Sequence, residues 1–232
     1  MKKNIQNLSV IWISRISDTE DNMLRNFFEK DDTEYEYERI LVGHTNLNPD
    51  VYKFKYIPFW DNGLDKLGLI SLKKNLGVLN ATKEYCLVLH ADTFPMKSLF
   101  ERMENISLSD KDIVSPIGYI KYPWGDIGYN RGLTWADSSD KDNLEKYNYW
   151  KQKNLLFNPD VRHKLPDESV SDWTYISGAS IFSKTSTFKT IGWNNNLRHV
   201  QGEDIEYSHR LKNNEYKLSC DPLLEVYMYN AT

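Results

Sequence analysis

YCLVLHAD, residues 85–92, is a continuously apolar run that ends in polar residues. Such a run is typical of a strand that is buried on both faces of a parallel sheet. Leucines at 69, 72, 76 and 79 precede it at helical spacing, and further apolar runs lie at 8–14, 40–43 and 52–59. Strands that alternate with helices in this way predict an α/β fold with a mainly parallel central sheet flanked by helices.

The whole composition fits one folded domain. The chain has 232 residues, 40% of them apolar, and a formal net charge of −4, so we expect a single domain over residues 1–232. A slightly acidic chain without a run of Lys or Arg does not favour nucleic-acid binding. The sequence also lacks a membrane-spanning apolar stretch and a signal peptide, which predicts a soluble cytoplasmic protein. The two cysteines, Cys86 and Cys220, fit buried thiols in a reducing compartment.

An aromatic-rich stretch from about 121 to 173 interrupts the regular pattern. It shows neither helical nor strand periodicity, and segments of this length without a period tend to be functional insertions. We expect it to shape a binding site, because flat aromatic rings can pack against the apolar face of a ligand, and the resemblance described below implies that this is the acceptor site. The candidate rings in and near it are Trp124, Trp135, Trp173 and, beyond the insertion, Trp193. Packing of the insertion onto the sheet is an equal alternative.

Three short groups of residues are candidates for chemistry. His90 and Asp92 close the strand at 85–90, and an extended chain directs both side chains to one side, where they can reach one divalent cation. Glu203 and Asp204 begin a predicted helix, where carboxylates either stabilise the helix dipole or include a general base. Gly178 and Ala179 lie in a predicted strand over 174–184, and glycine in a strand marks either a close approach by a ligand or a bulge. Spacing alone does not decide between these alternatives.

In this order, the three groups resemble the family 2 glycosyltransferases of the GT-A fold. The family carries a stretch like RN-x-G…GEY…LDAD, which residues 73–92, KKNLGVLNATKEYCLVLHAD, resemble. Its second signature, sGa…f…iGg-f…ED-x-x-x-x-x-R, resembles residues 177–210, SGASIFSKTSTFKTIGWNNNLRHVQGEDIEYSHR. The positions that match there are Gly178, Phe188, Gly192, Glu203, Asp204 and Arg210. The resemblance covers about residues 8–120 and 174–229.

The resemblance implies that a sugar moves from a UDP- or GDP-sugar donor to a hydroxyl of a glycan or lipid-linked glycan. It implies Asp92 and His90 as ligands of a divalent cation, and imidazole favours Mn²⁺ over Mg²⁺. It also implies Asp204 as the base in an inverting displacement, with Glu203 as the alternative base or as a residue that orients the acceptor. Donor contacts are expected from Lys74, Asn75, Asp61, Gly178 and Ala179. A role in polysaccharide biosynthesis at the inner membrane face follows from the family alone, and peripheral membrane association stays open.

The chain departs from the family pattern at two places. The segment VGHTNLNPD, residues 42–50, has no acidic residue where relatives place an aspartate against the nucleobase. Tyr227, Met228 and Tyr229 stand where many relatives supply a histidine ligand, so a third ligand is either absent or another residue such as His199.

The sequence also bears on alternative functions for an α/β protein. A nucleotidyltransferase or a dinucleotide-binding enzyme needs a glycine-rich loop after the first strand, and residues 10–21, VIWISRISDTED, contain no glycine. A catalytically silent carbohydrate- or nucleotide-sugar-binding protein on the same fold remains the alternative, because a decayed metal site would show the same His90 replacement. The net negative charge favours a metal-dependent enzyme, because an anionic donor needs a cation beside these carboxylates.

Overall fold

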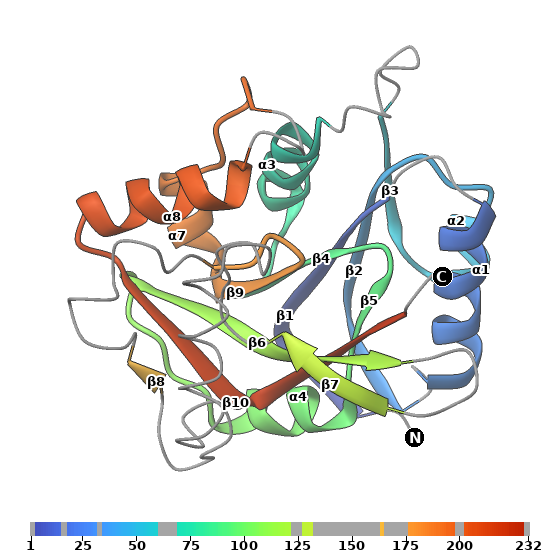
Figure 1. The fold of residues 1–232 in the computed structure, drawn as a ribbon. Coiled ribbons are helices and arrows are strands. Elements are labelled where there is room, and N and C mark those ends of the chain that lie inside the picture. Colours follow the sequence, from blue (N-terminus) through green and yellow to red (C-terminus); the bar gives the residue numbers. More distant parts are fainter. Residues whose placement is uncertain are drawn as a thin grey trace.

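The computed structural model describes residues 3–14, 18–31, 34–59, 69–121, 127–131, 163–164, 176–197 and 202–229. Ten strands within these ranges form one sheet, with β7 and β8 attached beside the main order β3-β2-β1-β4-β9-β6-β10-β5 (Figure 1). The strands are β1 Lys3–Ile13, β2 Tyr35–Gly43, β3 Lys55–Pro58, β4 Tyr85–His90, β5 Thr93–Pro95, β6 Asp112–Lys121, β7 Ile127–Arg131, β8 His163–Lys164, β9 Ser180–Lys184 and β10 Lys217–Tyr229. The helices are α1 Asp18–Asn26, α2 Pro49–Tyr52, α3 Ile70–Asn80, α4 Lys97–Arg102, α7 Thr185–Thr190 and α8 Glu203–Asn213, with a π-helical turn at Phe27–Asp31 and a 3₁₀ turn at Met103–Asn105.

The predicted α/β fold with a mostly parallel sheet is confirmed. Strands β3, β2, β1 and β4 run parallel to one another, and β6 runs parallel to β10. Strand β9 lies antiparallel between β4 and β6, and β5 pairs antiparallel with the end of β10. Since β9 runs opposite to both of its neighbours, β4 and β6 point the same way. The carboxyl ends of β1, β4, β6 and β10 therefore lie at one edge of the sheet.

Both faces of the sheet are covered by helices, which explains the unbroken apolar strands. In β1, Val10 and Trp12 pack into one core cluster, and the alternate residues Ile11 and Ile13 pack into the other. The first cluster includes side chains of α1 and α4, and the second includes side chains of α3, α7 and α8. Figure 1 shows α3, α7 and α8 together on one side of the sheet. Period-2 alternation here separates two buried faces, not a buried face from an exposed one.

The helical face predicted for α3 is wrong. Leu79 is 65% exposed, whereas Lys73 and Lys74 are 1% and 0% exposed. The buried side of α3 is made by Ile70, Ser71, Lys73, Lys74, Gly77 and Val78. Leucine spacing misled because the two lysines have specific polar partners inside the protein, described below. In α8, Ile205, Ser208 and Leu211 have the spacing of one helical face, yet Ile205 is 42% exposed while Leu211 is fully buried.

Two strand-like runs lie near the end of the sequence, YKLSC at 216–220 and LLEVYMY at 223–229. In the structure they belong to one strand, β10, whose pairing with β6 is irregular between Asp221 and Glu225. Cys86 is a buried free thiol, as predicted, and burial strongly raises the pKa of that thiol. None of the described helices has the length and apolar character needed to cross a membrane.

Candidate functional site

The candidate residues from distant parts of the sequence meet at the carboxyl edge of the sheet. Strand β4 ends there at His90, and the His90 N–H donates to the carbonyl of Ala179, just before β9 begins, at 3.0 Å. The N–H of Tyr229, the last residue of β10, donates to the carbonyl of Asp92 at 2.9 Å. Ligands of open α/β sheets bind at this edge, so the sheet itself brings the predicted groups together.

Asp92 lies in a turn and not in extended chain. Ala91 and Asp92 form the turn between β4 and β5, so the expected alternation from His90 to Asp92 does not apply and that geometric prediction is wrong. The Ala91 N–H donates to Ile13 at 3.1 Å, and the Thr93 hydroxyl donates to Asp92 Oδ1 at 3.1 Å. The Asp92 side chain is partly exposed. Its turn is thus tied to β1 and β10, and its carboxylate still reaches the surface.

The first turn of α8 presents the second carboxylate. Gly202 adopts a left-handed conformation, φ +66°, which a residue without a side chain adopts at little cost, and α8 begins directly after it. Asp204 is partly exposed. Its Oδ2 accepts from the Gly178 N–H at 3.2 Å, and its Oδ1 accepts from the Ile205 N–H at 2.9 Å. These two backbone hydrogen bonds fix the Asp204 carboxylate beside Gly178.

Glu203, the neighbouring carboxylate, faces inward. Its Oε1 lies 3.4 Å from the Nζ of Lys74, and the two side chains are 5% and 0% exposed. Burial lowers the pKa of the Lys74 ammonium, and the negative charges of Glu203 and Asp204 counteract part of that decrease. A Cβ on Gly178 would lie 2.9 Å from both Lys74 Nζ and Glu203 Oε1. Gly178 therefore packs closely against this ion pair, while the approach of a ligand at Gly178 remains a prediction.

Asn75 and Trp193 lie beside the ion pair. The Asn75 amide donates to the Trp193 carbonyl and to Asn195 Oδ1, both at 2.7 Å, and accepts from the Trp193 N–H at 2.8 Å. The Trp193 ring is 3% exposed and stacks between Phe188 and Tyr207, with centroids 5.2 and 4.6 Å away. These contacts account for Asn75 and Trp193 as residues that hold the segment before α8, while their contacts with donor and acceptor remain predictions.

A second polar group at the same edge was not found from the sequence. The Lys73 ammonium donates to the carbonyl of Ser14 at 2.9 Å, just after β1, and the Ser14 hydroxyl donates to the carbonyl of His44 at 2.7 Å, just after β2. Asp21 of α1 accepts from the Thr45 hydroxyl and the Asn46 N–H. A carboxylate from α1 therefore lies beside the part of segment 42–50 where relatives would place an aspartate of their own. Polar residues that close strands, here Ser14 and His44, were the signal available.

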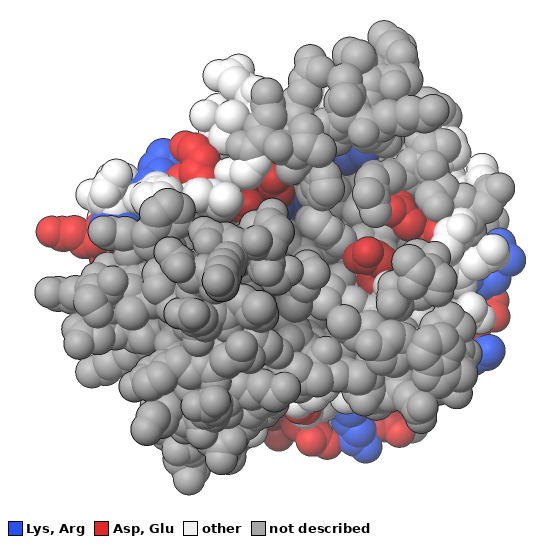
Figure 2. Space-filling view, in the orientation of Figure 1, with Lys and Arg blue, Asp and Glu red and all other residues white. Residues whose placement is uncertain are grey.

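Few side chains in the described part of this sheet edge are available to hold a divalent cation. Among the described residues, no three His, Cys, Asp or Glu side chains come close enough together to hold a metal ion. Asp92 and the strand-end His90 are two candidate donors, and their role as metal ligands remains a prediction. Figure 2 shows acidic side chains at the surface near the turn between β4 and β5 and beside the beginning of α8.

Several predicted site residues lie outside the described part of the chain. These are Asp61, Trp124, Trp135, Trp173 and His199. Their predicted contacts with donor, acceptor or metal remain predictions, as does the role of the aromatic insertion.

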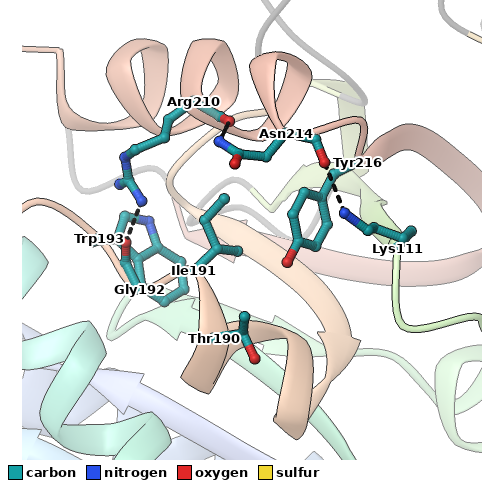
Figure 3. A pocket seen from close by; sticks show the side chains of 8 residues that line it. All are labelled: Lys111, Thr190, Ile191, Gly192, Trp193, Arg210, Asn214 and Tyr216. Atoms are coloured by element: carbon teal, nitrogen blue, oxygen red, sulfur yellow. Dashed lines mark hydrogen bonds between the residues drawn. The ribbon is translucent and has the colours of Figure 1, made fainter.

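A cavity of about 670 Å³ lies at the opposite edge of the sheet (Figure 3). It is lined by Lys111, Thr190, Ile191, Gly192, Trp193, Arg210, Asn214 and Tyr216. Lys111 immediately precedes β6 and Tyr216 precedes β10, so the cavity opens at the amino ends of these parallel strands. Its cations already have partners: Lys111 donates to the Asn214 carbonyl at 2.8 Å, and Arg210 donates to the Gly192 carbonyl at 2.7 Å. Trp193 lines this cavity and also lies 5.5 Å from Lys74 Nζ, so the cavity and the carboxyl-edge group share this residue.

Comparison with solved structures identifies the type of fold. The structure of GalNAc-T7 with UDP, GalNAc and Mn²⁺ superposes with a TM-score of 0.64 at 13% identity, over 97% of this chain and 44% of that one. The fold is that of the GT-A glycosyltransferases. Two structures of the S. aureus glycosyltransferase TarS match with a TM-score of 0.55. One is 16% identical over 97% of this chain and 37% of that one; the other, TarS 1–349, is 18% identical over 96% and 60%.

The chain therefore spans between 37% and 60% of the length of the solved structures it matches. No protein-family model matches the sequence, and no curated protein matches it either. At identities this low the superpositions establish the fold, and the reaction has to be argued from the residues of this chain.

Proposed function

We propose that this chain is a metal-dependent glycosyltransferase that moves a sugar from a UDP- or GDP-sugar to a hydroxyl of a glycan or lipid-linked glycan. The observation that carries the proposal is the meeting of Asp92, Gly178 and Asp204 at the carboxyl edge of a GT-A sheet. That edge is where open α/β sheets bind ligands. GalNAc-T7, which shares the fold, was solved with UDP, GalNAc and Mn²⁺. Polysaccharide biosynthesis at the cytoplasmic face of the membrane is the proposed setting.

Asp204 is the proposed general base. Its carboxylate is partly exposed and accepts hydrogen bonds from two backbone N–H groups, whereas Glu203 is 4% exposed and paired with Lys74. A carboxylate has about four lone-pair directions, so two hydrogen bonds leave it able to accept a further proton donor. Asp204 is accordingly the better candidate to contact an acceptor hydroxyl.

The proposed reaction is a direct displacement with inversion. As the acceptor oxygen forms its bond to the anomeric carbon, Asp204 takes the hydroxyl proton, and the bond from that carbon to the diphosphate oxygen breaks. The nucleoside diphosphate leaves with the bonding electron pair. Asp92 and His90 would hold the divalent cation, with Mn²⁺ preferred to Mg²⁺, and the cation would supply positive charge for the departing diphosphate.

Calorimetric titration of UDP- and GDP-sugars, with and without Mn²⁺, tests the proposal. We expect binding that requires the metal and is lost in Asp92→Ala. Asp204→Asn should bind the donor as the native chain does but lose sugar transfer by a factor of about 10²–10⁴. Binding that is indifferent both to metal and to Asp92→Ala would refute the metal role, and full activity of Asp204→Asn would move the base to Glu203 or another group.

A catalytically silent sugar-nucleotide-binding protein is the second candidate. It is favoured by one observation, that Asp92 and His90 gather no third metal-ligating side chain among the described residues. Metal-dependent donor binding without transfer or donor hydrolysis, over a panel of acceptors, would select this candidate over the enzyme.

A further inference from the structure

Lys74 is enclosed inside the protein, which is not how a cation that contacts an anionic donor is placed. Its side chain is 0% exposed, and its Nζ lies 3.4 Å from Glu203 Oε1 and 5.5 Å from the centre of the Trp193 ring. Gly178 closes the remaining side, since an added Cβ there would lie 2.9 Å from Nζ. The ammonium thus faces a carboxylate, an aromatic ring and backbone, all from segments that surround the beginning of α8.

A buried ion pair of this kind seldom makes a fold more stable than apolar residues of the same volume would. Removing two charges from water costs several kcal/mol for each ion, and their attraction often only offsets that cost. Holding two segments in one fixed arrangement is the better-supported use of such pairs. Here the segments are α3, which carries Lys74, and the first turn of α8, which carries Glu203.

The first turn of α8 is also fixed to the strand edge through Asp204. The Gly178 N–H donates to Asp204 Oδ2 at 3.2 Å, and the Ser208 hydroxyl donates to the Asp204 carbonyl at 2.7 Å while accepting from the Ile176 N–H at 2.9 Å. Glu203 and Asp204 are consecutive, so a shift of Glu203 must shift the Asp204 carboxylate relative to Gly178. A displacement of Lys74 would therefore be passed through Glu203 to Asp204.

We propose that Lys74 is a positioning residue: by pairing with Glu203 across Gly178 it fixes the first turn of α8 and thereby the carboxylate of Asp204, and it does not contact the donor. This inference rests on the proposed function, in which Asp204 takes a proton from the acceptor. It replaces the donor contact that the family resemblance implied for Lys74.

Variants of the ion pair, measured for transfer and for donor binding, test the inference. Lys74→Met should lower kcat by about 100-fold, the size of effect expected when a reacting group is misplaced by about 1 Å, with the dissociation constant for the UDP- or GDP-sugar within twofold of native. Lys74→Met combined with Glu203→Gln should be no worse than Lys74→Met alone, because no buried charge is then left unpaired. Lys74→Arg, which keeps the charge, should recover a substantial part of kcat.

Two further variants separate positioning from general damage. Gly178→Ala keeps both charges but crowds the pair, and should also lower kcat without weakening donor binding. Lys55→Met is the matched control: Lys55 is exposed, donates to the Asn80 carbonyl at the end of α3, and should leave both measurements unchanged.

The inference is overturned if Lys74→Met weakens donor binding tenfold or more while kcat is kept, because Lys74 then contacts the donor. It is also overturned if the losses from Lys74→Met and Glu203→Gln multiply in the double variant. If the native chain neither binds nor transfers any nucleotide sugar, the proposed function fails, but the pairing is still tested by the amide resonance of Gly178 in a ¹⁵N spectrum. That resonance should shift in Lys74→Met and not in Lys55→Met, and an unchanged resonance contradicts the coupling to Asp204.

Discussion

Helix α8 carries two ion pairs of the same kind in opposite surroundings. Glu203, its first residue, pairs with Lys74 of a separate helix, and these side chains are 5% and 0% exposed. Glu206 and Arg210 pair within α8 at 2.9 Å, and their side chains are 32% and 31% exposed. Solvent screens the second pair far more than the buried first pair. Ion pairs of similar chemistry therefore differ in consequence: the buried Glu203–Lys74 pair holds two helices together, whereas the exposed Glu206–Arg210 pair contributes little to the fold.

Arg210 connects the exposed pair to the cavity at the far edge of the sheet. It donates to the Gly192 carbonyl (Figure 3). It also donates to Glu206, and its guanidinium lies 5.4 Å from the Tyr207 ring. Trp193 and Tyr207 stack together, with Lys74 over the first ring and Arg210 over the second. The aromatic pair thus links the two ion pairs, and only the buried one adjoins the carboxyl edge of the sheet.

Removing one partner of the buried pair should have the largest effect on the free energy of unfolding. Lys74→Met leaves Glu203 buried without a cation, and we expect the free energy of unfolding to fall by about 3–5 kcal/mol. Urea denaturation at pH 7 measures this loss. The Lys74→Met, Glu203→Gln double variant should recover a large part of it, and a double variant as unstable as Lys74→Met alone would contradict the assignment of the loss to an unpaired charge.

The pH dependence of stability should separate the pairs by a smaller amount. The ordinary pKa of lysine is 10.5, and burial lowers the pKa of Lys74 in the folded chain. The unfolded chain therefore binds more protons between the lowered value and 10.5, so stability rises with pH across that window, by at most about 1.4 kcal/mol per pH unit. Below the lowered value the full cost of burying the ammonium is present.

Denaturation of the native chain and of the Lys74→Met, Glu203→Gln variant over pH 7–10 measures this effect. The difference between the two chains is the informative quantity, because the other titrating groups are common to both. The native chain should gain relative to the variant as the pH rises. An Arg210→Gln variant should show no such trend, since a guanidinium does not lose its proton in this range; equal trends in both comparisons would mean that Lys74 is not the group responsible.

The smallest expected effect is that of Glu206→Gln at the exposed pair. We expect a loss of about 0.2–1 kcal/mol that shrinks further in high salt. Thermal unfolding at low and high salt checks this, with Lys74→Met as the contrast whose loss should change little with salt. A loss above about 2 kcal/mol would show that the exposed pair also holds the fold.

Much of the fold was predictable because buried parallel strands leave unbroken apolar runs in the sequence. The run at 85–90 located β4 correctly, but a turn replaces the extended chain expected at Asp92. The sequence failed in α3, where Leu79 fits an apolar face but is exposed and Lys74 is buried. Periodicity treats a lysine as a surface residue, and only the tertiary partner Glu203, far along the chain, makes its burial tolerable.

The sequence pointed to candidate site residues but did not indicate which contacts each of them makes in the fold. Gly178 was expected to make a close approach, yet nothing in its neighbours indicates that the approaching group is a lysine–glutamate pair and not a ligand. Glu203 and Asp204 look equivalent in the sequence, and the first turn of α8 directs one inward and leaves the other partly exposed. Such distinctions depend on three-dimensional packing, which spacing along one chain does not record.

The turn that carries Asp92 is held by strands from both ends of the chain: the Ala91 N–H bonds to Ile13 of β1, and the Asp92 carbonyl accepts from Tyr229 of β10. On the ribosome, Asp92 is synthesised long before Tyr229. At about 5–20 residues per second, several seconds pass before the last strand leaves the exit tunnel. A nascent chain can therefore pair β1 with β4 early, but it cannot complete this turn until synthesis has reached β10.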